Sequence, residues 1–127
     1  MQKKKDKIYQ SILVVAREAF LESGYKNTSM RAISKKSGIG LSNIYNYFKN
    51  KDELFKAVLA PLISHIDCLY EQHTGEEYLS LELFYSKDYQ RESIETMVSL
   101  VRNFRNELRL LLFHAYGSSL ENFREIL

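Results

Sequence analysis

Apolar residues in the first part of the chain recur at the spacing of a helix, not of a strand. Between residues 8 and 20 they lie three or four positions apart, which places them in one stripe on a helix surface. The residues of this stripe are Ile8, Ile12, Val15, Ala16, Ala19 and Phe20. Ser23 and Gly24 follow, and glycine is favoured just past a helix end. The pattern predicts a first helix that ends near Gly24, with residues 25–27 as a connection.

Two shorter helices are predicted next. Thr28 or Ser29 can cap the first of them, because a side-chain oxygen at this position accepts a hydrogen bond from a free backbone N–H. This helix is expected to stop at Gly38, and the next to span about residues 42–48 with Ile44 on its buried face.

The remainder of the chain also has helical periodicity. A fourth helix is expected to begin after Asn50, with a kink or a break at Pro61, because proline lacks the backbone donor and crowds the preceding turn. A short helix is predicted over residues 78–85, a long one from about Gln90 to Tyr116, and another from Leu120 onward. With no alternating strand pattern, the predicted fold class is all-α.

Composition agrees with a folded protein and narrows its surroundings. The 127 residues are 45% hydrophobic and 27% charged, which is an ordinary globular balance. No apolar run approaches the ~20 residues that a membrane-spanning helix needs. Cys68 is the single cysteine and cannot form an internal disulfide, as expected in a reducing compartment. We expect a cytoplasmic protein with no membrane partner.

Charge is distributed unevenly between the two halves. Residues 1–60 have a balance of +7 between basic and acidic side chains, whereas residues 61–127 have a balance of −5. A basic first half beside an acidic second half indicates that one end of the molecule meets a polyanion. A solvated lysine-rich terminus, Lys3 to Lys5, is the simpler explanation of the same asymmetry.

The two short helices and their glycine turn have the organisation of a helix-turn-helix. Gly38 permits a tight turn, and a small apolar core that includes Ile33 and Phe48 would hold the two helices at a steep angle. The polar side of residues 41–47 would then be free to enter the major groove of DNA, while neighbouring lysines and hydroxyls bind phosphates.

These residues resemble a known family. The segments SMRAISKKSGI (residues 29–39) and IYNYFKNKDEL (residues 44–54) are similar to the DNA-binding domain of the TetR family of bacterial transcriptional regulators. Ala19-Phe20, Gly24-Tyr25 and Thr28 also match the first helix and loop of that family, so the resemblance covers about residues 8–60. It implies a three-helix, homeodomain-like DNA-binding domain followed by a helical effector and dimerisation module.

The resemblance also implies which residues contact DNA. Phosphate contacts are expected from Thr28, Tyr45, Tyr47 and Lys51. Groove contacts are expected from Leu41, Ser42 and Asn43, with Asn46 nearby, and Arg31 is the candidate for a base or phosphate contact from the second helix. For Tyr45 and Tyr47 the alternative is packing at the edge of the core. Lys51 could be a solvated first-turn lysine, but a cation is unfavourable at a helix N-terminus, which favours a phosphate partner.

Two departures from the family pattern affect base reading. Gly40 stands where the family commonly has a capping serine, so the recognition helix is expected to begin less firmly. Leu41 occupies a position that is often polar, so its contact with DNA is expected to be an apolar one with a thymine methyl group.

The second half offers fewer candidate sites. Its aromatic residues, interspersed with glutamates, could form a pocket for a lipophilic cation, although aromatic residues at helical spacing are more commonly core residues. The candidate ligand-binding residues are Tyr70, Tyr85, Tyr89, Phe104 and Phe113. His65, Cys68 and His73 do not share one helix face, so no metal site is predicted, nor any cofactor. No nucleophile with a base, phosphate loop or carboxylate pair is present, so no enzyme is predicted.

We therefore expect a DNA-binding domain over residues 1–50 and a ligand-binding and dimerisation domain over residues 51–127, the latter incomplete because the chain is short for this family. The predicted function is a transcriptional regulator, a repressor by family default, that binds a palindromic DNA operator as a homodimer and is released by an unidentified small molecule. The alternative is a helical interaction module whose basic face binds an acidic protein or a membrane surface.

Overall fold

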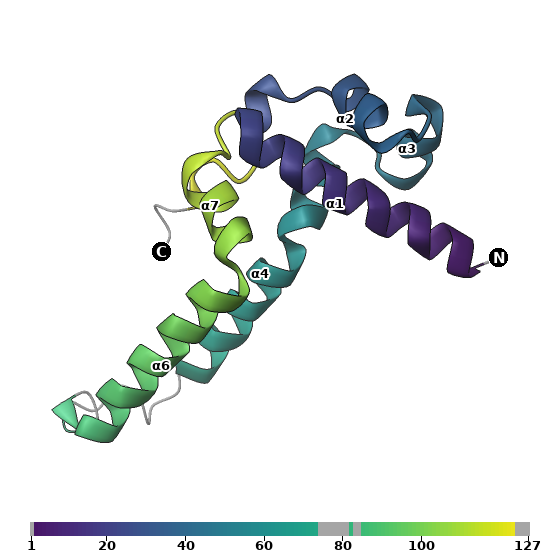
Figure 1. The fold of residues 1–127 in the computed structure, drawn as a ribbon. Helices are drawn as coiled ribbons and strands as arrows, with labels where there is room; N and C mark the ends of the chain where they lie inside the picture. The colour runs from purple at the N-terminus through teal and green to yellow at the C-terminus, as the bar shows by residue number, and fades with distance from the viewer. Residues whose placement is uncertain (1, 74–81, 83–84, 124–127) are drawn as a thin grey trace.

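The computed structural model describes residues 2–73, 82 and 85–123 and confirms the all-α prediction, because no strand occurs within these ranges. Helices and turns account for its architecture (Figure 1). The helices are α1 (Gln2–Asn27), α2 (Met30–Ser37), α3 (Leu41–Tyr47), α4 (Lys51–His73), α6 (Lys87–Asn103) and α7 (Arg105–Phe113). None of the helices in the described part is long and apolar enough to cross a membrane.

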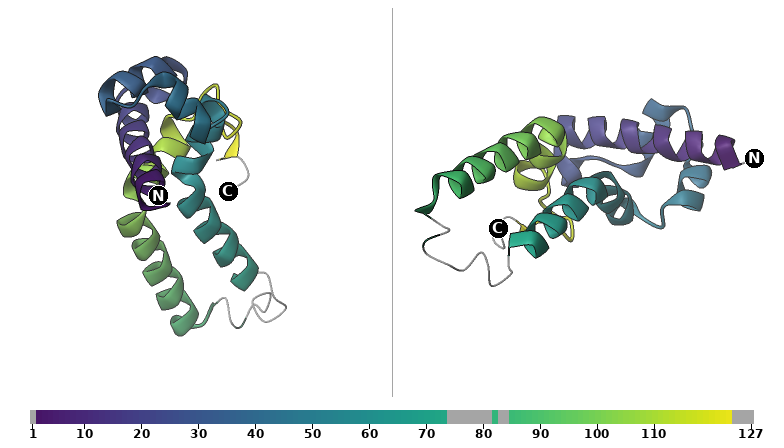
Figure 2. Two further views of the ribbon diagram at one scale, coloured as in Figure 1. Left: turned by 90° about the vertical axis from the view of Figure 1, so that its right-hand side faces the viewer. Right: turned by 90° about the horizontal axis from the view of Figure 1, so that it is seen from below.

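The helices are arranged as a body and a projecting arm. Figures 1 and 2 show α1, α2, α3, α7 and the beginning of α4 gathered in the body. The end of α4 and the whole of α6 extend away from it together, running in opposite directions. Because α4 belongs to both parts, it connects the arm directly to the helices of the predicted DNA-binding domain.

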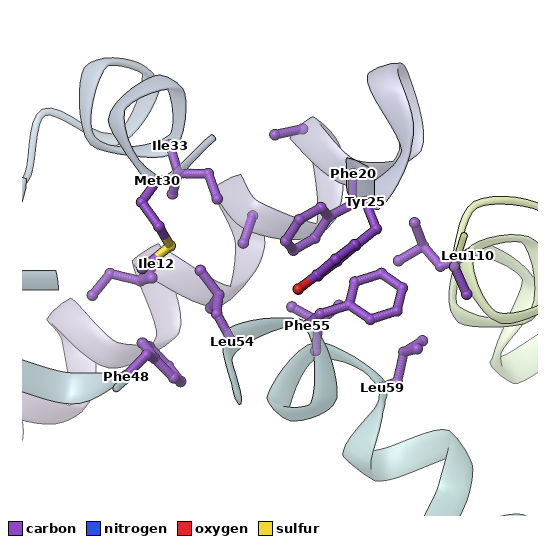
Figure 3. Packing of buried hydrophobic residues seen from close by; sticks show 14 of the residues in the cluster. Ile12, Phe20, Tyr25, Met30, Ile33, Phe48, Leu54, Phe55, Leu59 and Leu110 are labelled. Atoms are coloured by element: carbon purple, nitrogen blue, oxygen red, sulfur yellow. The ribbon is translucent and has the colours of Figure 1, made fainter. Parts of the chain in front are cut away.

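The core lies between α1, α4 and α7. Its centre is a group of three rings, in which Phe55 meets Phe20 edge-on with ring centroids 5.0 Å apart and contacts Tyr25 at 5.0 Å (Figure 3). The predicted stripe of the first helix is largely confirmed, since Ile12, Ala16, Ala19 and Phe20 are buried. Leu54, Phe55, Leu59 and Leu62 of α4 and Leu110 and Leu111 of α7 complete the same core. The expected boundary at residue 50 therefore does not separate two cores.

The end of α1 is organised by Gly24. Its φ of 81° and ψ of 165° interrupt the helical backbone where the sequence predicts the end, in a conformation open mainly to glycine. Helical structure then resumes through Asn27, so the expected connection over residues 25–27 is a short helical turn. Within it, the backbone N–H of Tyr25 donates to the carbonyl oxygen of His114 at 2.9 Å, which joins this turn to the end of α7.

Two of the predicted helix starts are confirmed by their hydrogen bonds. The hydroxyl of Ser29 accepts from the backbone N–H of Ala32 at 3.1 Å, and the side-chain oxygen of Asn50 accepts from Glu53 at 2.8 Å. Each bond satisfies one of the donors that a helix N-terminus leaves unpaired. The alternative cap for α2, Thr28, lies just outside the helix.

The later helices differ from prediction in three places. α4 continues through Pro61, so the predicted break is wrong, and only a bend within the helix is compatible with the structure. The predicted long helix is wrong as one element: α6 begins earlier, at Lys87, and Phe104 separates it from α7. Residues 119–122 form turns where a helix was expected. Most of the predicted helix over 78–85, and residues 124–127, lie outside the described residues.

Candidate nucleic-acid interface

The turn between α2 and α3 is fixed by short-range polar contacts. The hydroxyl of Ser34 donates to the carbonyl oxygen of Ile39 at 2.6 Å, and the hydroxyl of Ser37 accepts from the N–H of Ile39 at 3.1 Å. Gly38 ends α2 with a φ of 73°, in the left-handed region that glycine adopts without strain. These contacts hold α3 in a defined orientation on α2, as the sequence predicts for a helix-turn-helix.

One side of α3 is anchored and the other is exposed. Ile44 is completely buried and Phe48 nearly so, which fixes the inner side of the helix. Ser42 and Asn46 are exposed, and the amide of Asn46 donates to the side-chain oxygen of Asn43 at 3.4 Å. Side-chain amides can both donate to and accept from the edges of bases, so the exposed side carries groups suited to reading DNA.

The start of α3 agrees with the weak cap expected at Gly40, but it limits the apolar contact with DNA expected from Leu41. Gly40 occupies the N-cap position and provides no side-chain hydrogen bond to the helix. Leu41 is half-buried and packs against the core, so only part of its side chain is available for the expected apolar contact with a thymine.

An open hollow beside α3 gathers several of the predicted DNA-contacting residues. It includes Thr28, Arg31, Leu41, Tyr45 and Lys51, which come from four different parts of the fold. The complete lining is Lys26, Asn27, Thr28, Ser29, Met30, Arg31, Leu41, Tyr45 and Lys51. Three of these side chains are cationic and none is acidic, so the hollow favours an anion such as a phosphate group.

Lys51 has a partner within the protein, so its place at a helix N-terminus no longer requires a phosphate partner. Its ammonium donates to the carbonyl oxygen of Tyr25 at 2.9 Å and lies 4.2 Å from the centroid of the Tyr25 ring. Burial lowers the pKa of Lys51, and burial followed by the charge of Asp52 raises the pKa of Tyr25. The cost of a cation at the start of α4 is thus offset without DNA. An ammonium has three protons, so Lys51 retains donors for a phosphate.

Thr28 is placed as a structural residue. It is 4% exposed, and its hydroxyl lies 2.7 Å from the carbonyl oxygen of Gly24 and 3.2 Å from that of Ala19. A hydroxyl has one proton to donate, and these carbonyls already occupy it. A phosphate contact from this hydroxyl, as expected from the sequence, would require that bond to be given up.

Replacing Thr28 with Val is expected to lower the free energy of unfolding by about 1–3 kcal/mol, because the isosteric side chain leaves buried carbonyl oxygens without their donor. The matched control is Thr28→Ser, which keeps the hydroxyl and should retain most of the stability. Urea denaturation of the three proteins measures the difference. Equal stability of the Val and Ser variants would show that the hydroxyl has no structural role.

Tyr47 lies apart from Tyr45. It is half-buried, with its ring centroid 6.4 Å from that of Tyr9, and it lines a second hollow that also includes Lys49. The two tyrosines are two positions apart on a helix, which turns them toward different sides. The expected phosphate contacts of Tyr45 and Tyr47 therefore belong to different flanks of α3.

Sequence reasoning missed two cations at this surface. Lys26 lines the first hollow, where its ammonium also lies 5.2 Å from the ring centroid of Tyr116, and Lys49 lines the second. Their positions just before Thr28 and just after Phe48, at the margins of the matched motif, are the signal that could have identified them.

Three of the five candidate ligand-binding residues, Tyr70, Phe104 and Phe113, lie in different surroundings. Tyr70, Tyr85 and Phe113 are more than two-thirds exposed. Tyr70 lines an apolar hollow between α4 and α6, whereas Phe113 lines a different hollow near the end of α7. Phe104 instead packs against His65, with ring centroids 5.2 Å apart. As for metals, the described residues contain no group of three His, Cys, Asp or Glu side chains able to hold an ion.

An anchored α2–α3 pair, with a polar outer helix beside a cationic hollow, defines the chain as a helix-turn-helix protein. Residues 12–58 match the family described as bacterial regulatory proteins, tetR family, so this part of the chain has the helix-turn-helix domain of that family. The match includes α2, α3 and the beginning of α4, so it covers most of the residues that form the surface described above.

Several curated bacterial proteins are similar to the chain. The uncharacterized HTH-type transcriptional regulator YhgD of Bacillus subtilis is 38% identical over 55 residues, which cover 43% of this chain and 29% of the relative. The fatty acid metabolism regulator protein of Bacillus subtilis is 34% identical over 86 residues, covering 64% of this chain and 44% of the relative. The HTH-type transcriptional regulator SAB2452 of Staphylococcus aureus is 28% identical over 105 residues, covering 79% and 56%.

The chain thus spans between 29% and 56% of the length of these relatives. No solved structure matches it significantly.

Proposed function

We propose that this chain is a transcriptional regulator that binds double-stranded DNA through α3. The observation that carries the proposal is the cationic hollow formed by Lys26, Arg31 and Lys51 directly beside the exposed polar side of α3. Phosphate contacts position a protein on DNA, and contacts with base edges provide the sequence specificity. The surface supplies both kinds of group within one short helix and its neighbours.

In the proposed complex, α3 lies in the major groove. Ser42, Asn43 and Asn46 face the base edges, where a side-chain amide can pair with an adenine through two hydrogen bonds. Arg31 and Lys51 contact phosphates on the flank that also carries Tyr45, and Tyr47 contacts the backbone on the opposite flank. Thr28 supports this surface by fixing the end of α1 through its carbonyl contacts.

We further propose that two copies bind one palindromic operator as a repressor, and that a small molecule releases them. In this scheme residues 1–50 bind DNA and residues 51–127 form the effector and dimerisation part. The apolar hollow between α4 and α6, lined in part by Tyr70, supports a site for an apolar effector. α4 supports the coupling, because it extends without a break from this hollow to the core beneath α1.

The experiment that tests the proposal is selection from a pool of random duplex DNA, followed by affinity measurements at about 50 and 200 mM salt. We expect enrichment of a palindromic site. Two copies that each place Lys26, Arg31 and Lys51 near phosphates should lose about 10³-fold in affinity over this range. Enrichment of single half-sites would support DNA reading and contradict binding as a dimer.

Absence of binding, or binding with no preference for sequence, would contradict the regulator and favour the interaction module. If the chain is an interaction module, its basic surface should bind an acidic polypeptide or an anionic vesicle at least as strongly as DNA. Titrations with polyglutamate and with phosphatidylserine vesicles distinguish an interaction module from a DNA-binding regulator.

A further inference from the structure

The cationic hollow beside α3 is bordered by a segment that comes from a distant part of the chain. Residues 114–121, called here the α7 clasp, follow α7 and turn back against the end of α1 and the start of α4 (Figure 1, yellow). The carbonyl oxygen of His114 accepts from the backbone N–H of Tyr25 at 2.9 Å, and the backbone N–H of Ser119 donates to Oδ1 of Asp52 at 2.9 Å. The clasp therefore joins the two elements that supply both lysines of the hollow.

The α7 clasp has a defined shape because its own polar groups hold it. The hydroxyl of Ser118 is buried, donates to the carbonyl oxygen of Ala115 at 2.6 Å and accepts from the N–H of Leu120 at 3.1 Å. The N–H of Gly117 donates to a carboxylate oxygen of Glu121 at 3.0 Å. A side chain that starts within this turn thus has a fixed origin and is directed toward a definite place.

Both lysines of the hollow lie against tyrosine rings that the α7 clasp holds. The ammonium of Lys51 lies 4.2 Å from the ring centroid of Tyr25, whose backbone is bound by the clasp. The ammonium of Lys26 lies 5.2 Å from the ring centroid of Tyr116, a residue of the clasp itself. A cation within about 6 Å of a ring centroid is attracted to the ring face. Because Lys26 is exposed and has a long side chain, this attraction decides where its ammonium lies.

We propose that Tyr116 is a positioning residue for DNA binding, because its ring holds the Lys26 ammonium at the border of the cationic hollow, where it meets a phosphate. An ammonium has three protons, so contact with the ring leaves donors for the phosphate. In this scheme Tyr116 acts only through Lys26. Residues 12–58 match the family, so the DNA-binding surface of this chain includes a residue that lies far outside the matched domain.

This inference rests on the proposed function and deepens it, since it concerns the phosphate site of the same surface. Two duplexes allow the two proposals to fail separately. The first is the selected operator, and the second is a scrambled duplex of the same length and composition. Preference for the operator tests the regulator, whereas the effect of Tyr116 on phosphate binding is measurable with either duplex at low salt.

The test is fluorescence anisotropy with both duplexes for the wild type, Tyr116→Ala and Tyr116→Phe. We expect Tyr116→Ala to raise the Kd about threefold for each hollow that contacts DNA, because an exposed cation–π contact is lost. Tyr116→Phe keeps the ring face and should stay within about 1.5-fold of the wild type. The matched control is Phe113→Ala, which removes another exposed ring near the end of α7 that does not line the cationic hollow, and it should leave the Kd unaltered.

A role through Lys26 requires the effect of Tyr116 to disappear when Lys26 is replaced. In the Lys26→Gln background, Tyr116→Ala should change the Kd by less than about 1.5-fold. The dependence of log Kd on log salt should also fall in Tyr116→Ala toward that of Lys26→Gln, since both lose a phosphate contact. A merely structural role of Tyr116 would not produce this agreement.

NMR of the DNA-free protein provides a second measurement. The ring current of Tyr116 should shift the ε-methylene protons of Lys26 upfield in the wild type and in Tyr116→Phe. In Tyr116→Ala these protons should return toward the ordinary lysine position. An unchanged shift in Tyr116→Ala would overturn the proposal, because the ring would then not hold the ammonium. Far-UV circular dichroism establishes that each variant is folded, as expected for substitutions at an exposed position.

The binding data have three further outcomes. If Tyr116→Ala binds the operator as tightly as the wild type, or if its loss persists in the Lys26→Gln background, the proposal is overturned and the regulator stands. If the wild type binds both duplexes equally but Tyr116→Ala still weakens binding through Lys26, only the regulator is contradicted. Absence of binding to either duplex would contradict both proposals.

Discussion

Replacing Phe55 with Ala is expected to lower the free energy of unfolding by about 3–5 kcal/mol. The side chain is completely buried, and its ring contacts those of Phe20 and Tyr25, each with centroids 5.0 Å apart. The substitution removes apolar contact area and leaves a cavity that the surrounding helices can only partly fill. Because domains are stable by only about 5–15 kcal/mol, this is a large part of the total.

Phe113→Ala is the matched control for this experiment. Phe113 is 73% exposed at the end of α7, so the same chemical change should alter stability by no more than about 0.5 kcal/mol. Guanidinium denaturation of both variants, followed by circular dichroism, measures the two effects. If Phe55→Ala were as stable as Phe113→Ala, the three-ring cluster would not be the centre of the core.

The second large effect is expected in DNA binding. The double variant Arg31→Ala/Tyr45→Phe should bind the selected operator about 100-fold more weakly, since it removes a guanidinium and a single phenolic hydroxyl from the cationic hollow. Tyr45→Phe keeps the ring, and both residues are exposed, so the fold should be unchanged. Fluorescence anisotropy with a labelled operator duplex measures the affinity.

Arg109→Ala/Tyr70→Phe provides the corresponding control, because it makes the same two changes at exposed positions of α7 and of the arm, neither of which lines the cationic hollow. It should bind with wild-type affinity. A similar loss in both double variants would mean that net charge alone determines binding. No loss in either variant would exclude the hollow as a phosphate site.

Features that depend on neighbours in sequence could be predicted. The cap residues Ser29 and Asn50 act on backbone groups three positions away, and Gly38 only needs a left-handed conformation at its own position. For the same reason the anchoring of α3 by Ile44 and Phe48 follows from their spacing. These local rules define the helix-turn-helix and the position of its exposed side.

Features that depend on contacts between distant parts of the chain could not be predicted from the sequence. Lys51 and Tyr25 are 26 positions apart, so nothing in the local pattern shows that the ammonium already has a carbonyl partner. Periodicity also treats Ile94 and Leu110 alike, although Leu110 is completely buried and Ile94 is 64% exposed. Only the division at Phe104, which directs α7 into the body and leaves α6 in the arm, distinguishes their surroundings.

The contact between Lys51 and Tyr25 has a consequence for the thermodynamics of binding. A lysine side chain has about 2 kcal/mol of rotamer entropy to lose when it becomes ordered. The carbonyl and ring of Tyr25 already restrict the Lys51 ammonium in the DNA-free protein. In the proposed complex, association with DNA would immobilise a group that has little conformational freedom left, so the entropic penalty at this contact would be correspondingly small. Under the proposed function, rigidity at the start of α4 would act as pre-organisation for the operator.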